Sequence, residues 1–106
     1  MRKKFIKEID GKSIVIIKQD IQGICQLRVE VGTNGYQGGD TGHGSRTYIR
    51  LEDIGGTDME IETGKNKYGS IYTEIKFGGD AELSNLLEAL EFIQNTLKEQ
   101  IKKQNK

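Results

Sequence analysis

The stretch DAELSNLLEALEFIQNTLKEQIKK, residues 80–103, decides the fold of this chain. Its aliphatic residues recur every three or four positions, which is the spacing of one stripe along an α-helix. Acidic residues open the stretch and lysines close it, as the helix dipole favours. The stripe comprises Leu83, Leu86, Leu87, Leu90, Ile93, Leu97 and Ile101. We therefore predict one long helix over about residues 80–103, and we expect this stripe to cover the apolar face of a sheet.

The residues before the helix are typical of β-strands, from about residue 3 to residue 77. In most of these runs apolar and polar side chains alternate, which is the pattern of a strand with one buried face. Asp10-Gly11 is a strong hairpin signal, and short connections favour an antiparallel meander. The runs lie at residues 5–9, 13–18, 25–31, 46–51, 58–62 and 71–77. The sequence predicts an α+β fold: a five- or six-stranded, mainly antiparallel sheet with one long C-terminal helix packed on its apolar face.

Composition limits the classes of function. The 106 residues suit a single domain, and 16 basic and 16 acidic side chains cancel, which argues against a nucleic-acid partner. No apolar run approaches the length that spans a membrane. The single cysteine, Cys25, cannot form an internal disulfide and favours a cytoplasmic location. Twelve lysines against four arginines, with 14 isoleucines and two alanines, indicate an AT-rich gene, as in a low-GC bacterium or its phages and mobile elements.

The length of the predicted helix favours self-association. At about 1.5 Å per residue the helix measures roughly 33 Å, whereas strands of six or seven residues span only about 20–24 Å. The helix should therefore extend past the sheet and carry Leu97 and Ile101 with it. Because a second copy would bury both side chains, we predict a homodimer formed through the end of the C-terminal helix or the sheet surface next to it.

The loop at residues 32–46, GTNGYQGGDTGHGSR, contains six of the chain's 14 glycines. A hairpin connection needs only about two to five residues, and long ordered loops are more often functional than idle. Glycine also allows a backbone to approach a ligand closely. We therefore predict a binding loop. Its candidate ligand-binding residues are Asn34, Tyr36, Gly38, Gly39, Asp40, Gly42, His43, Gly44, Ser45 and Arg46.

Patterns for catalysis and metal binding are weak in this loop. Asp40-Thr41-Gly42 resembles the active-site triplet of aspartic proteases, but glycines precede it where that family has apolar strand residues. His43 lacks the partners of a zinc site, and the acidic residues do not follow a calcium-loop pattern. Ser45 lies outside any G-x-S-x-G pattern. The sequence therefore predicts no catalytic residue, metal or cofactor and favours a protein that is not an enzyme, with a small hydrolase as the third alternative.

The same loop suits an anionic ligand. Neighbouring glycines present backbone N–H groups that can form an anion-binding nest, and Arg46 can contact a phosphate bidentately. Tyr36 can stack on a base or a sugar. Arg46 and Arg50 could instead pair with acidic residues of the next predicted strand. Those acidic residues are Asp58, Glu60 and Glu62.

The leading expectation is a small non-enzymatic binding module whose loop captures a phosphorylated or nucleotide-like ligand, which would sequester it. The alternative is a protein–protein inhibitor or adaptor that acts on a host protein. It would use the same loop and the charged face of the sheet. Release of a bound nucleotide, or capture of one macromolecule, distinguishes the two.

Overall fold

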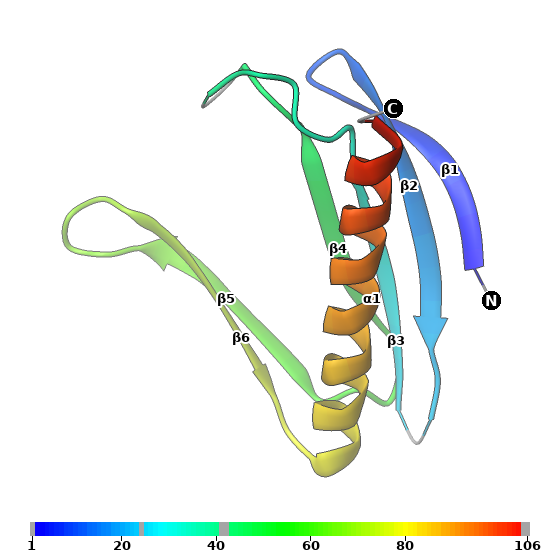
Figure 1. Ribbon diagram of the computed structural model, residues 1–106. Helices are drawn as coiled ribbons and strands as arrows, with labels where there is room; N and C mark the ends of the chain where they lie inside the picture. The colour runs from blue at the N-terminus through cyan, green and yellow to red at the C-terminus, as the bar shows by residue number, and fades with distance from the viewer. Residues whose placement is uncertain (1, 24, 41–42, 105–106) are drawn as a thin grey trace.

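The computed structural model describes residues 2–23, 25–40 and 43–104. Its six strands precede one long helix, and the helix lies across one face of the larger sheet (Figure 1). The elements are β1 (Arg2–Ile9), β2 (Lys12–Ile21), β3 (Gln26–Thr33), β4 (Thr47–Gly55), β5 (Met59–Lys65), β6 (Ile71–Phe77) and α1 (Asp80–Gln104). The predicted α+β class and the C-terminal helix are confirmed.

The strands form two antiparallel sheets where the sequence predicted one. The strands β1, β2, β3 and β4 make a four-stranded meander, and β5 pairs only with β6 among the described residues. The β5–β6 hairpin, residues 59–77, projects from the body of the molecule and diverges from α1 (Figure 1). We call this hairpin the arm.

The turn after β4 explains why the sheet stops there. The Asp53 side chain accepts hydrogen bonds from the backbone N–H groups of Gly55 and Thr57, at 3.0 and 3.2 Å. The Thr57 hydroxyl donates to the carbonyl of Gln26 at 2.7 Å, and Gly56 has a positive φ of 65°. These bonds turn the chain away from the open edge of β4 before β5 begins.

The helix faces the sheet with only part of the predicted stripe, since Ile93 and Leu97 pack against the core and three leucines do not. The residues that it buries are small, polar or aromatic, and each is at most 9 % exposed: Glu82, Asn85, Ala89, Phe92 and Thr96. Leu83, Leu87 and Leu90 were expected on the sheet but are 54, 60 and 52 % exposed. We call these three residues the leucine flank. The most buried positions lie one residue before the predicted ones, and Leu86, Ile93, Leu97 and Ile101 are half-buried along the edge of this stripe.

Buried polar side chains set this rotation. The Asn85 amide donates to the carbonyl of Cys25 at 3.0 Å, and a Glu82 carboxylate oxygen accepts from the N–H of Asp58 at 3.1 Å. Turning the leucines inward would break both bonds. Since each unpaired buried polar group costs about 1–3 kcal/mol, these bonds oppose such a rotation.

The core lies between α1 and the centre of the meander. Its buried members are Ile21, Leu27, Val29, Val31, Ala89 and Phe92. Leu97 packs against this cluster, and Gln100 hydrogen-bonds to the sheet. The prediction that the end of the helix extends past the sheet is therefore wrong. The ten-residue strand β2 spans about 33 Å, so it matches most of the helix.

The meander splits between β2 and β3. Their pairing ends at Ile17 and Val31, after which β2 continues with β1 and β3 continues with β4. Gly32 occupies the branch, where a Cβ would collide with the carbonyl oxygen of Val15 and lie 2.8 Å from Ile16 Cδ1. Because glycine has no side chain, the backbones of β2 and β3 can still touch at Gly32, just where their pairing has ended.

We predict that Gly32→Ala lowers the free energy of unfolding by about 2 kcal/mol or more, because the added methyl group forces two backbones apart. Gly23→Ala is the control, since the nearest atom to its added Cβ is 3.7 Å away. Urea unfolding measures both variants. Equal stabilities would contradict the close approach at Gly32.

Candidate functional site

The predicted binding loop folds back on itself. At its base, the N–H of Arg46 donates to Asn34 Oδ1 at 2.8 Å, and the N–H of Asn34 donates to the Arg46 carbonyl at 3.3 Å. Farther out, the N–H groups of His43 and Gly44 both donate to the carbonyl of Asp40, at 2.8 and 3.0 Å. Several backbone groups that a ligand could have used are thus bonded within the loop.

Two candidate glycines have a structural role in this contact. A Cβ on Gly39 would lie 2.5 Å from the carbonyl oxygen of His43, and a Cβ on Gly44 would collide with the carbonyl of Gly39. Gly38 has a positive φ of 81° with open space around it. The remaining candidate glycine, Gly42, lies outside the described residues.

Arg46 joins the loop to the turn between β1 and β2. Its Nε donates to Asp10 Oδ2 at 2.9 Å, and its Nη1 donates to the carbonyls of Gly44 and Ser45 at 3.1 and 3.2 Å. Only 16 % of the side chain is exposed. The guanidinium therefore stabilises the loop conformation in this structure.

The other loop candidates lie on the outside. Tyr36 is 76 % exposed, and Asn34 is half-buried at the base of the loop. The remaining side chains exposed to solvent are those of Asp40, His43 and Ser45. The structure therefore presents these residues on a surface, with Asn34 and Arg46 beneath them.

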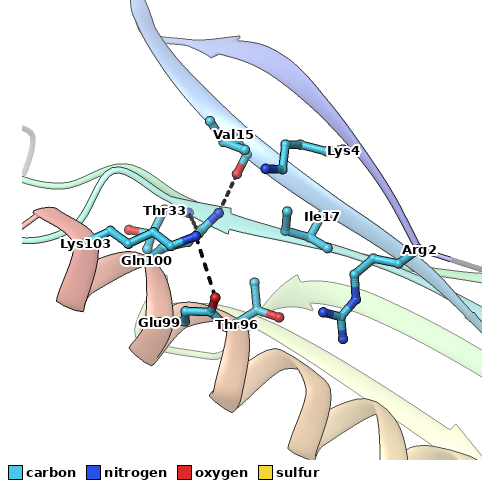
Figure 2. A pocket seen from close by; sticks show the side chains of 9 residues that line it. All are labelled: Arg2, Lys4, Val15, Ile17, Thr33, Thr96, Glu99, Gln100 and Lys103. Carbon is cyan, nitrogen blue, oxygen red and sulfur yellow. Dashed lines mark hydrogen bonds and ion pairs between the residues drawn. The ribbon is translucent and has the colours of Figure 1, made fainter.

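A cavity of about 380 Å³ lies between α1 and the β1–β2 side of the meander (Figure 2). Val15 and Ile17 give it an apolar wall. Its complete lining is Arg2, Lys4, Val15, Ile17, Thr33, Thr96, Glu99, Gln100 and Lys103. Since Thr33 is also the last residue of β3, the glycine-rich loop leaves the sheet at the edge of this cavity.

The cavity exists because the meander splits. Where the β2–β3 pairing has ended, the Gln100 side chain occupies the gap: its Oε1 accepts from the N–H of Thr33 at 2.8 Å, and its Nε2 donates to the carbonyl of Val15 at 2.9 Å. Figure 2 shows both bonds. A side-chain amide thus replaces a backbone amide between two strands, and space remains beside it.

The cationic side chains come from both walls of the cavity. Arg2 lies over the ring of Phe92, with its guanidinium carbon 5.4 Å from the ring centroid. Lys103 Nζ lies 3.6 Å from a carboxylate oxygen of Glu99. Lys4 extends from β1 into the same space (Figure 2). Three cations and one carboxylate make the cavity attractive to an anion.

These cations were not among the residues selected from the sequence. Arg2 and Lys4 alternate with Lys3, so a first strand beginning at residue 2 places them on one face. In the structure that face is turned toward α1, because Lys4 pairs with Ile17. The alternation was the available signal, but only the docked helix brings Lys103 to it.

The opposite face of the meander carries a ladder of ion pairs. Arg28 Nε lies 2.8 Å from Asp20 Oδ1, and Arg28 also approaches Glu52 at 3.9 Å. The hydrogen bond from Arg28 lowers the pKa of Asp20 below its ordinary value, and the same bond raises the pKa of Arg28. The charge of Arg28 is therefore balanced by acidic side chains on the same face of the sheet.

Arg50 belongs to the same ladder. Its Nη1 lies 3.3 Å from Glu30 Oε2 and 2.7 Å from Glu52 Oε1. The partners proposed from the sequence lie at 58–62, in the first strand of the arm and the turn before it, whereas the ion pairs of Arg50 in the described residues are with Glu30 and Glu52. Because β5 does not pair with β4, the acidic partners come from β3, as Glu30, and from β4 itself, as Glu52.

We predict that Gln100→Ala destabilises the chain by about 1–3 kcal/mol, because it leaves the carbonyl of Val15 and the N–H of Thr33 without their partner. Gln94→Ala is the control: it is exposed on the same helix and shares any change in helix propensity. Equal unfolding free energies in urea for the two variants would show that the Gln100 bonds contribute nothing.

The Asp20–Arg28 pair predicts a pH dependence. Since the pKa of Asp20 is lowered in the folded chain, its stabilisation is present above the ordinary value of 3.8 and is lost as the pH falls through the lowered pKa. The difference in unfolding free energy between the wild type and Asp20→Asn should therefore shrink on acidification. Urea titrations from about pH 6 to pH 2 measure it, and a constant difference would contradict the pairing.

The described part of the chain offers few other signs of chemistry. Among its histidine, cysteine, aspartate and glutamate residues, no group of three is placed to hold a metal ion. In the part of the chain that the structure describes, no helix is both long enough and apolar enough to cross a membrane. No family model, curated protein or solved structure matches this chain.

Proposed function

We propose that this chain is a small non-enzymatic binding module that sequesters a small phosphorylated or nucleotide-like ligand. The observation that carries the proposal is the cavity beside α1, which three cationic side chains and an apolar wall line. Its volume of about 380 Å³ falls within the roughly 300–1,000 Å³ of small-molecule sites. We therefore place the proposed binding site in this cavity, at the base of the glycine-rich loop.

The lining supports a ligand with two parts. Arg2, Lys4 and Lys103 supply charge for a phosphate, and Arg2 can bond two of its oxygens at once. Val15 and Ile17 supply an apolar surface for an organic body. The exposed loop with Tyr36 begins at the cavity edge, so it can contribute contacts to the same ligand.

The lining supports binding over catalysis. Its one carboxylate, on Glu99, pairs with Lys103, and its other polar groups are hydroxyls, amides and cations. Gln100 is already engaged through both its amide oxygen and its nitrogen. Such a set can hold an anion, but it lacks the paired nucleophile and base that group transfer uses.

The alternative function, a protein–protein inhibitor or adaptor, rests on one observation. Tyr36 stands 76 % exposed on the loop, and exposed tyrosines are frequent anchors in protein interfaces. The charged face of the sheet gives this alternative less support, since Arg28 and Arg50 pair within the chain. A cytoplasmic location and an origin in a phage or mobile element remain parts of the sequence-based proposal, as does self-association through α1.

We predict that Arg2→Ala together with Lys103→Ala lowers the affinity for an anionic ligand by at least about 10-fold, because even one charge-assisted bond contributes roughly 1.5–3 kcal/mol. The control is Lys76→Ala with Lys98→Ala, which removes the same charge outside the cavity. Protein incubated with cell extract is washed and denatured, and the released molecules are identified by mass spectrometry. Equilibrium dialysis of the released compound then compares the variants.

Two outcomes would contradict this proposal. A protein that releases no phosphorylated compound and retains one macromolecule instead supports the inhibitor or adaptor. A ligand whose affinity falls equally in the cavity variant and in its charge-matched control is held by the overall field and not by this cavity.

A further inference from the structure

The arm has one apolar face that the chain leaves open. Pairs across the hairpin alternate between the two faces, so Ile61 and Ile75 share a face with Met59 and Phe77. Met59 packs against the core at the base of the arm, which turns this face toward the side of α1. Farther out, Ile61 and Ile75 are 56 and 42 % exposed. An isolated two-stranded hairpin is only marginally stable in water, so this face lacks a cover.

The leucine flank of α1 is the second open surface. Leu83, Leu87 and Leu90 lie on the side of the helix away from the buried stripe, and each is more than half exposed. Ile49, on the helix-facing side of β4 opposite Val31, is also half exposed. In Figure 1 the arm and α1 diverge from their junction, and β4 runs behind them. Helix, strand and arm thus present aliphatic side chains to a common space.

The chain exposes more surface than a compact monomer of its mass, and the excess is similar to the area that a subunit buries in a dimer. The chain has an accessible surface of 7448 Å². A folded monomer of this mass exposes about 5,950 Å², so roughly 1,500 Å² is in excess. Obligate homodimers bury about 1,000–2,500 Å² per subunit. The radius of gyration, 15.5 Å, also exceeds the value of about 13 Å expected for a compact chain of this length.

We infer that two copies of the chain form a symmetric dimer in which the leucine flank of each helix fits between the arm and the helix of the other copy. The arm is long enough to cover the flank. The arm face from Phe77 to Ile71 runs about 20 Å, and the leucine flank from Leu83 to Leu90 runs about 11 Å. A twofold axis uses each surface twice, so one contact type covers both arms and both flanks.

A second copy fits this space for two reasons. Each chain holds both an uncovered apolar arm and an uncovered apolar flank, so the surfaces are complementary to each other. The formal net charge of the chain is zero, so two copies meet without overall repulsion. This interface lies along the N-terminal half of α1 and the arm, and it is independent of the cavity that serves the proposed function.

Sedimentation equilibrium on the full chain, over a range of concentrations, tests the dimer. The wild type should have twice the mass of one chain at tens of micromolar. Leu87→Asp and, separately, Ile61→Asp should each raise the dissociation constant at least about 30-fold, the effect of losing a central apolar contact. The control is Ser84→Asp, which places the same charge on an exposed position of the same helix outside the leucine flank. Because Leu87 and Ile61 are exposed in one chain, circular dichroism should show both variants folded.

Hydrogen exchange tests whether the arm takes part. In the dimer the backbone amides of β5 and β6 should exchange slowly, and Leu87→Asp should remove that protection although it changes only the helix. A monomeric wild type would overturn the inference, as would a dimer that both Asp variants leave intact. The proposed interface would be overturned if Ser84→Asp dissociated the dimer as strongly as Leu87→Asp does. It would also be overturned if the arm amides exchanged equally fast in the wild type and in Leu87→Asp.

Discussion

The hydrogen bonds between α1 side chains and backbone groups of the meander determine which face of the helix is buried, and the other features depend on that choice. Asn85 bonds the carbonyl of Cys25 near one end of the helix, and Gln100 bridges Val15 and Thr33 near the other. The bonded backbone groups lie where strand pairing is absent or has ended. A helix rotated to bury its leucines would leave them unpaired, and burial of unpaired polar groups is costly.

Two surfaces follow from this one rotation. On the β1 side the helix presents polar residues and Lys103 to the split in the meander, where the side-chain amide of Gln100 bridges the two strands and a cavity remains beside it. On the β4 side it presents the leucine flank, which a different rotation would have placed in the core. The anionic ligand and the second copy that we propose therefore use opposite sides of the same helix.

Local patterns in the sequence predicted the elements well. The predicted helix at 80–103 is observed as Asp80–Gln104, and all six predicted runs are strands. The orientation of the helix was missed because hydropathy ranks a leucine above Asn85 or Gln100. The bonds that reverse this ranking join residues 60 and 85 positions apart, Asn85 with Cys25 and Gln100 with Val15. No short window of sequence contains both partners.

The same limit applies to the candidate site. The sequence shows that glycines cluster, but it does not show that Gly39 and Gly44 lie against each other, where a Cβ on either would collide with the loop backbone. The cavity was not predictable, because it needs the split at Gly32, a strand that starts at Arg2 and a helix end docked on both. The arm was read as part of one sheet, since the turn that frees it uses a hydroxyl bond from Thr57 to Gln26 across the fold.

The position of Cys25 makes its thiol a native probe of how α1 docks on the sheet. Its thiol is 1 % exposed and lies under α1, where Sγ accepts a hydrogen bond from the Asn85 amide at 3.2 Å. A thiol reagent can reach it only when the helix lifts, so the rate of alkylation reports how often that opening occurs. Since the chain has no other cysteine, every modified molecule records the same event. The energetics of one tertiary contact can thus be followed in the unaltered protein, without a label.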